Sequence, residues 1–204
     1  MTDQKILIIG SGFAAAANLI HLVEAGIKPS QITIVGPGQL GRGNAYGCDD
    51  DDFRLNVRAN LMWIWPDRRD DFGNWAKTHI KDDKDAMRRS GMFYRRRDFG
   101  RYVASRVDAV LAGANEHDNT IIHYPQIVTK LGRMDQGGWQ AECSDGRLIK
   151  ADLVLLATGN PPPQWPCPIH GEKAQLLELE NRLVQNSWNG QWLDHLPAQS
   201  RLAI

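Results

Sequence analysis

The opening of the chain places a glycine-rich turn between an apolar strand and a helix. Residues 6–9 are all aliphatic, and the turn 10–15, with the sequence GSGFAA, follows at once. Residues 13–25 are rich in alanine and leucine and predict a helix, and Gly26 is a residue type that commonly ends one. Residues 31–35, with the sequence QITIV, predict a second strand. Continuous apolar strands are typical of parallel sheets, so this region predicts a β-α-β unit.

The turn fits the pattern G-x-G-x-x-A, in which each small residue has its own steric task. Gly10 permits the tight turn out of the strand, and Gly12 leaves room for a pyrophosphate to approach the backbone. Ala15 lets the helix pack closely on the sheet. The free N–H groups and the positive end of the helix dipole then face the phosphates. The pattern alone is weak, but its position between strand and helix predicts a dinucleotide site.

The chain does not repeat this unit after residue 35. Residues 36–47 contain five glycines and predict an irregular loop, and residues 49–52 are four aspartates. An insertion before the next buried strand is typical of FAD domains rather than of NAD domains. The further elements that periodicity and turn residues predict are helices over 67–80 and 96–112, a β-meander over 120–150, a buried strand over 152–157 and a helix at about 173–188.

Composition argues against several classes of protein. The 204 residues carry 24 basic and 24 acidic side chains, whereas a nucleic-acid protein usually has a clear basic excess. The longest apolar runs are far shorter than the ~20 residues of a membrane span. Cys48, Cys143 and Cys167 stand far apart, and the histidines show no metal spacing. We therefore expect a cytoplasmic protein with reduced thiols and without a metal, membrane or nucleic-acid partner.

Four further segments carry a family pattern: LGRGNAYG at 40–47, LNV at 55–57, RDFGRY at 97–102 and ATGNPP at 157–162. In this order they resemble a bacterial family of FAD/NAD(P)-binding proteins related to the flavin-dependent N-hydroxylating monooxygenases. The resemblance runs from residue 5 to about 165. It implies an α/β, Rossmann-like FAD/NAD(P)-binding fold, in which helices flank a parallel sheet and the chain inserts a helical segment and a β-meander.

The same resemblance implies a set of residues that would contact FAD. The glycine-rich turn would meet the pyrophosphate, the segment at 56–57 would lie toward the flavin, and the strand after Pro125 would contact adenine through its backbone. The end of the strand at 152–157 would close over the cofactor. The candidate cofactor-binding residues are Gly10, Ser11, Gly12, Phe13, Ala14, Ala15, Gly36, Arg42, Asn56, Val57, Val128, Ala157, Thr158 and Gly159.

The end of the second strand departs from the family pattern. The family usually has an acidic residue there, which bonds the adenosine ribose, and this chain has Gly36. Losing charged hydrogen bonds of this kind costs about 1.5–3 kcal/mol. Two interpretations stay open. In the first, which we prefer, FAD binds more weakly and other contacts compensate for the missing acidic residue. In the second, the neutral site with Arg42 nearby accepts the 2′-phosphate of NADP.

The resemblance also predicts how the chain is organised. Residues 1–165 would form the FAD-binding domain, and residues 166–204 a connector, a helix and the start of a second, incomplete NAD(P)-binding domain. The chain would be a fragment, the FAD-binding portion of an NAD(P)H-linked, monooxygenase-like oxidoreductase with an unknown small-molecule substrate. The alternative is a non-catalytic or degenerate dinucleotide-binding module. Because the flavin ring carries the hydride, no catalytic residue is assigned. The oligomeric state is left open, with a homo-oligomer as one option.

Seven arginines between residues 88 and 106 form a basic cluster. One interpretation is a site for phosphate, an acidic substrate or nucleic acid. The interpretation we favour is a solvated helix face that nearby aspartates neutralise, with Arg97 and Arg101 the first candidates for an exception. The arginines are Arg88, Arg89, Arg95, Arg96, Arg97, Arg101 and Arg106, and the aspartates are Asp82, Asp83, Asp85, Asp98 and Asp108.

Overall fold

The computed structural model divides the chain into two compact units, Met1–Gly159 and Asn160–Ile204. It describes residues 3–115, 119–160, 164, 184–186, 190–197 and 199–201. In the second unit the described part includes the 3-10 helix η3 (Gly190–His195). The helix expected at about 173–188 lies outside the described residues except for 184–186. The assignment of 1–165 and 166–204 to two nucleotide-binding domains stays a prediction.

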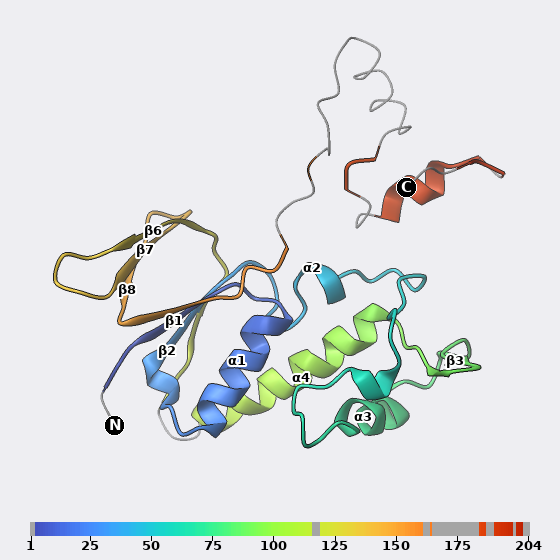
Figure 1. Cartoon of the computed structure of the whole chain (residues 1–204), viewed down its shortest axis with the longest axis horizontal. Helices are drawn as coiled ribbons and strands as arrows, with labels where there is room; N and C mark the ends of the chain where they lie inside the picture. Colours follow the sequence, from blue (N-terminus) through green and yellow to red (C-terminus); the bar gives the residue numbers. More distant parts are fainter. Residues whose placement is uncertain are drawn as a thin grey trace, which may run out of the picture. The chain divides into compact units, whose positions relative to one another are not determined.

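The first unit is built on a four-stranded parallel sheet in the order β5-β2-β1-β9 (Figure 1). The strands are β1 (Ile6–Ile9), β2 (Ile32–Val35), β5 (Ile122–Tyr124) and β9 (Leu153–Leu156). Helix α1 (Phe13–Glu24) joins β1 to β2, and the two strands pair in parallel. The predicted β-α-β unit is confirmed.

The helices cover one face of this sheet and a second sheet covers the other (Figure 1). Ile6 and Ile8 point into a core shared with α1 and with α4 (Arg96–Asn115), whereas Leu7 and Ile9 point into a second core. The second core is closed by an antiparallel meander of β6 (Val128–Arg133), β7 (Trp139–Cys143) and β8 (Leu148–Ala151). Burial on both faces explains why the first strand is continuously apolar.

Strand β5 belongs to a different sheet from the one that the sequence predicts. Residues 120–124 were expected to open the β-meander of 120–150, but β5 pairs in parallel with β2, with Thr33 opposite Ile122. Pro125 follows β5 directly, and a residue without an N–H cannot continue a strand ladder. The chain leaves the parallel sheet there, and the meander begins only at Val128.

Strand β9 differs from the expectation of a buried strand over 152–157. Leu153 is 47% exposed and Leu156 is 69% exposed. Among the described strands β9 pairs only with β1, so it is an edge strand and part of its apolar surface stays open to solvent.

The inserted segment between β2 and β5 supplies the remaining helices. The helices expected over 67–80 and 96–112 are confirmed as α3 (Asp71–His79) and α4. No helix in the described part of the chain is long and apolar enough to cross a membrane. The shorter elements are η1 (Pro29–Gln31), α2 (Gly43–Tyr46), η2 (Ala59–Leu61), β3 (Met87–Arg88) and β4 (Gly91–Met92).

A partly buried polar clamp fixes α3 to α4. The hydroxyl of Tyr102 donates to Oδ2 of Asp71 at 2.7 Å, and Arg106 donates to both carboxylate oxygens at 2.8 and 2.9 Å. Tyr102 is fully buried, and its burial together with the bond to Asp71 raises the pKa of its hydroxyl well above 10. The phenol therefore stays a hydrogen-bond donor at every physiological pH.

We expect the Asp71→Ala variant to lose roughly 2–3 kcal/mol of unfolding free energy, because it leaves the buried Tyr102 hydroxyl unsatisfied. Tyr102→Phe removes the hydroxyl itself and should lose only about 1 kcal/mol. Urea unfolding of both variants measures the difference. The control is Asp70→Ala, since the Asp70 side chain makes no capping hydrogen bond to α3. Equal losses for Asp71→Ala and Asp70→Ala would contradict the clamp.

Candidate dinucleotide site

The glycine-rich turn lies where three strand ends meet. The N–H of Gly10 donates to the carbonyl of Val35 at 2.7 Å, and the N–H of Ala157 donates to Ile9 at 2.8 Å. Gly10 has φ 126°, and a Cβ on it would lie 2.1 Å from the carbonyl oxygen of Ala157. Only glycine tolerates both this positive φ and this close approach of the Ala157 carbonyl. The first glycine of the motif therefore holds the ends of β1, β2 and β9 together.

The N-terminus of α1 is open for an anion. Gly12 is the N-cap residue, no side chain caps the helix, and its first turn contains no acidic residue. Gly12 is half-buried and Ala14 is exposed, whereas Ala15 is fully buried against the sheet. A Cβ on Gly12 would lie 3.7 Å from its nearest neighbour, the Cα of Gly43, so space remains beside the backbone. This cradle fits a pyrophosphate.

Phe13 contributes to this cradle through its backbone alone. Its ring packs into the core against Tyr46 and Phe99, with centroid distances of 6.3 and 5.6 Å. The side chain of Ser11 is also engaged, because its hydroxyl donates to the carbonyl of Pro37. The groups that the turn offers to phosphates are therefore main-chain N–H groups.

The glycine-rich loop after β2 closes against the turn. The N–H of Gly41 donates to the carbonyl of Ser11 at 2.8 Å. A Cβ on Gly43 would lie 2.8 Å from the Cα of Gly12. The loop backbone thus lies beside the pyrophosphate cradle, and this close approach explains the glycine at position 43.

Gly36 is enclosed by the same turn. A Cβ at this position would lie 2.5 Å from the carbonyl carbon of Gly10 and 2.6 Å from the nitrogen of Ser11. The carbonyl of Gly36 lies 3.0 Å from Nε2 of His123. The acidic residue that the family pattern places here has no room in this backbone, so its absence has a steric reason.

Arg42 is engaged by the chain itself. Its Nη2 lies 2.7 Å from Oδ1 of Asp49, and the guanidinium also donates to the carbonyls of Tyr46 and Gly47 at 3.4 and 3.5 Å. The bond from Arg42 holds the pKa of the Asp49 carboxyl below its usual value. An NADP 2′-phosphate on Arg42 would have to displace this ion pair.

The other predicted residues lie in different parts of the first unit. Thr158 and Gly159 are exposed and follow Ala157 directly at the turn. Asn56 is exposed and Val57 half-buried, and no hydrogen bond among the described residues links them or Val128 to the turn. The structure brings together the motif residues, Gly36 and the end of β9. Val128 packs against the second core, which contains Ile9 and Val35 at the ends of β1 and β2.

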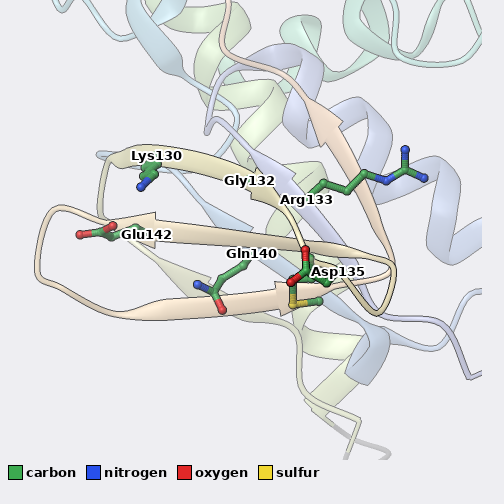
Figure 2. Close-up of a pocket in the computed structure, with 7 residues that line it drawn as sticks. Lys130, Gly132, Arg133, Asp135, Gln140 and Glu142 are labelled. Carbon is green, nitrogen blue, oxygen red and sulfur yellow. The ribbon is translucent and has the colours of Figure 1, made fainter.

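A pocket on the meander is lined by none of these residues (Figure 2). Lys130 pairs opposite Glu142 and Gly132 opposite Gln140, on the face that points away from the buried Ala141. The hollow has a volume of about 350 Å³ and contains none of the predicted site residues. Its lining is Lys130, Gly132, Arg133, Met134, Asp135, Gln140 and Glu142.

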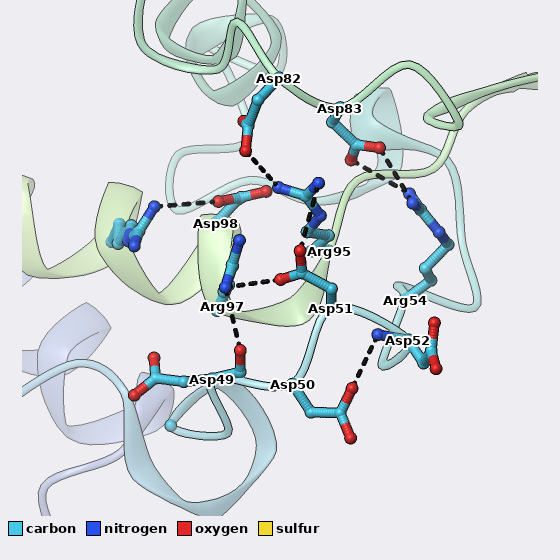
Figure 3. Close-up of polar contacts among 12 residues, drawn as sticks. Asp49, Asp50, Asp51, Asp52, Arg54, Asp82, Asp83, Arg95, Arg97 and Asp98 are labelled. Carbon is cyan, nitrogen blue, oxygen red and sulfur yellow. Dashed lines mark hydrogen bonds and ion pairs between the residues drawn. The ribbon is translucent and has the colours of Figure 1, made fainter.

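Members of the acidic run at 49–52 form ion pairs and hydrogen bonds with members of the arginine cluster (Figure 3). The sequence did not predict these contacts. Asp51 lies 2.5 Å from Arg97 and 3.4 Å from Arg95. Arg54 holds the buried Asp83 with two bonds of 2.9 and 3.0 Å. The side chain of Arg95 is 9% exposed and that of Arg97 is 17% exposed. The expectation of a solvated helix face is therefore wrong for Arg95, whereas Arg97 is one of the two arginines expected to be exceptions.

Asp98 is the most deeply buried carboxyl of this network apart from Asp83. Its side chain is 3% exposed, its ion pair with Arg101 is long at 3.5 Å, and its Oδ2 has no hydrogen-bond partner among the described residues. Burial raises the pKa of this carboxyl above its ordinary value, and the nearby Arg95, Arg101 and Arg97 only partly oppose the shift.

A parallel sheet with an open helix N-terminus at its glycine turn, covered by a meander, defines a dinucleotide-binding α/β protein of the Rossmann type. A family model described as FAD-NAD(P)-binding matches residues 7–161. The chain belongs to this FAD-NAD(P)-binding family. The expected family, fold and type of cofactor are thereby confirmed.

Solved structures support the same fold. The structure of OTEMO in complex with FAD and NADP (form 3) matches with a TM-score of 0.52 and 15% identity, over 83% of this chain and 28% of that chain. The FAD-bound form 2 of OTEMO gives a TM-score of 0.50 and 16% identity, over 80% of this chain and 26% of that chain. The structure of the peptidyl tryptophan dihydroxylase QhpG matches with a TM-score of 0.47 and 18% identity, over 83% of this chain and 34% of that chain.

The two OTEMO structures show the fold alone, because their sequences are only 15% and 16% identical to the chain. The chain spans about a quarter to a third of the length of the three structures. A search of curated proteins finds no match to the chain.

The Gly36→Ala variant should be less stable by about 1–3 kcal/mol, because the added methyl overlaps the backbone of Gly10 and Ser11. The control is Gly113→Ala in α4, where a Cβ meets nothing within 4 Å and the substitution should stabilise the helix. Thermal unfolding of the two variants tests this contrast. Unchanged stability of Gly36→Ala would show that the loop can withdraw from the turn.

The Asp98→Asn variant should be more stable than wild type at pH 7. A raised carboxyl pKa means that the folded chain favours the neutral form, so wild type loses stability as the pH rises above the ordinary value of 3.8. Below pH 3.8 the two proteins should become equal. Unfolding midpoints across this range measure the effect, with the exposed Asp108→Asn as control. Destabilisation of Asp98→Asn at pH 7 would contradict the raised pKa.

Proposed function

We propose that the chain binds FAD and serves as the flavin-binding part of an NAD(P)H-linked, monooxygenase-like oxidoreductase. The observation that carries this proposal is the open helix N-terminus beside Gly10 and Gly12 in a chain of the FAD-NAD(P)-binding family. The fold supports it, since OTEMO, whose structure was determined with FAD and NADP, shares the arrangement at a TM-score of 0.52.

Main-chain groups would hold the pyrophosphate. The first-turn N–H groups of α1, at Phe13 and Ala14, face the cradle, and the positive end of the helix dipole favours the negative charge there. The loop backbone from Gly41 to Gly43 closes the cradle from the second side. When bound, FAD would supply hydride and electron transfer, and the chain's part is to bind and orient it.

The ends of the cofactor would lie on two further segments. Asn56 and Val57 would face the flavin, and the backbone of Val128, where the meander leaves the parallel sheet, would face adenine. We further propose that residues 1–165 form this FAD domain and that residues 166–204 begin the domain that receives NAD(P)H. The free thiols of Cys48 and Cys143 support a cytoplasmic location.

Gly36 favours a second candidate, a dinucleotide-binding module without catalytic activity. Its enclosed backbone leaves no room for the acidic group that the family pattern places at the ribose. Anaerobic addition of NADPH to the FAD-loaded protein separates the two candidates when that protein carries the complete domain that receives NAD(P)H. Loss of the flavin absorbance band supports the oxidoreductase, and a persistent band in a chain that holds flavin supports the module.

We expect Gly12→Ala to fold and to bind FAD at least about tenfold more weakly than wild type. Its Cβ would make an ordinary 3.7 Å contact and the φ of −80° suits alanine, but the methyl would occupy the approach of the pyrophosphate. Flavin fluorescence titration measures the affinity, and circular dichroism verifies the fold. Gly132→Ala on the meander, where a Cβ meets nothing within 4 Å, is the control. Equal affinity of Gly12→Ala and wild type would contradict the pyrophosphate site.

A further inference from the structure

Two arginines at the N-terminal end of α4, the buried Arg95 just before the helix and the half-buried Arg97 in its first turn, are bridged by one carboxylate from an exposed loop (Figure 3). We call them the arginine pair. Asp51 reaches both guanidinium groups, at 3.4 and 2.5 Å, although its own side chain is 53% exposed. A carboxylate shared by two guanidinium groups is the arrangement in which proteins bind carboxylate and phosphate ligands.

The arginine pair has hydrogen-bonding capacity that the described residues leave unused. Nε of Arg95, Nε of Arg97 and Oδ2 of Asp98 are all buried and have no partner among the described residues. Buried polar groups in native proteins are normally satisfied, so two unused donors beside an exposed carboxylate indicate a place for a further acceptor. A ligand with two or more anionic oxygens supplies such acceptors.

The other carboxylates near the pair contact Arg95 or are matched by arginines outside the pair. Arg95 also contacts Asp82 at 3.1 Å, and Arg97 donates to the main-chain carbonyl of Asp49 at 3.0 Å. Asp98 lies beside them, and its burial favours the neutral carboxyl. Asp83 is already matched by Arg54 through two bonds. Without Asp51, Arg97 would retain no carboxylate partner among the described residues.

The position of the pair connects it with the proposed flavin side. Arg95 forms an antiparallel bridge with Arg54, and the N–H of Leu55 donates to the carbonyl of Tyr94 at 2.9 Å. Asn56 and Val57 follow directly. An anion on the arginine pair would therefore lie next to the segment that we place toward the flavin, so this inference rests on the proposed function.

We propose that the arginine pair binds the carboxylate or phosphate group of an anionic small-molecule substrate, and that Asp51 occupies the pair as an internal anion until the substrate displaces it. Exposed ion pairs are weak individually, which makes the loop carboxylate replaceable. Because Asp51 is tethered, it competes at an effective concentration in the millimolar range or above. Removing its charge should therefore strengthen anion binding, although the variant loses an ion pair.

The test compares Asp51→Asn with Asp52→Asn in the full chain saturated with FAD, so that the pyrophosphate cradle is filled. Both variants remove one charge from the same acidic run, but the Asp52 side chain forms no ion pair within the part of the chain that the structure describes. Inorganic phosphate and succinate are titrated separately while the Nε–H resonances of Arg95 and Arg97 are followed by NMR.

We expect Asp51→Asn to bind at least one probe about tenfold or more tightly than wild type, and Asp52→Asn to match wild type. Succinate alone would identify a carboxylate substrate, phosphate alone a phosphorylated one, and both would identify a general anion site. The double variant Asp51→Asn/Arg97→Lys should show a smaller gain in anion affinity, because the lysine ammonium group lacks the planar pair of donors of a guanidinium group.

Equal affinities of Asp51→Asn and Asp52→Asn would overturn the proposal. The proposal would also be overturned if Asp51→Asn were less stable but bound neither anion more tightly, since the role of Asp51 would then be structural. A FAD titration of the same samples separates this failure from that of the proposed function. If wild type fails to bind FAD, the flavin role fails, whereas the contrast between the two variants still reports on the arginine pair.

Discussion

The close approach of Gly10 to the carbonyl of Ala157 is the constraint on which the first unit depends. A backbone with φ 126° and no Cβ lets the chain turn within the space between β2 and β9. The same turn sets where α1 begins, and therefore where its unpaired first-turn N–H groups point. One glycine thus connects strand pairing, helix direction and the electrostatics of the site.

The features that the sequence predicts well are those that neighbouring residues determine together. The β-α-β unit follows from apolar runs and a glycine turn within 35 residues. Strand β5 could not be assigned to its sheet in this way, because three residues, Ile122–Tyr124, carry too little pattern to identify a partner. Its pairing with β2 depends on contacts across the whole inserted segment.

The candidate site shows the same difference between features that local sequence determines and features that depend on long-range contacts. Gly10, Gly12 and Ala15 were predicted from their motif because each has a local steric task. The contact between Arg97 and Asp49 joins helix α4 to a loop 48 positions earlier in the chain, and composition shows only that charges balance. Burial of Arg95 is equally invisible in the sequence, since arginine is mostly exposed in proteins.

The enclosed Gly36 has a consequence for how such a site would select its ligand. Without a carboxylate at the ribose, the contacts that remain at the turn are main-chain N–H groups, and these recognise a pyrophosphate in FAD and NAD(P) alike. Discrimination in favour of FAD would then have to come from the flavin end of the cofactor. In the proposed function, that end would lie on Asn56 and Val57, which adjoin Arg54 and the arginine pair. Under the proposed function, the segment that distinguishes the cofactor also borders the substrate, so one loop would influence both.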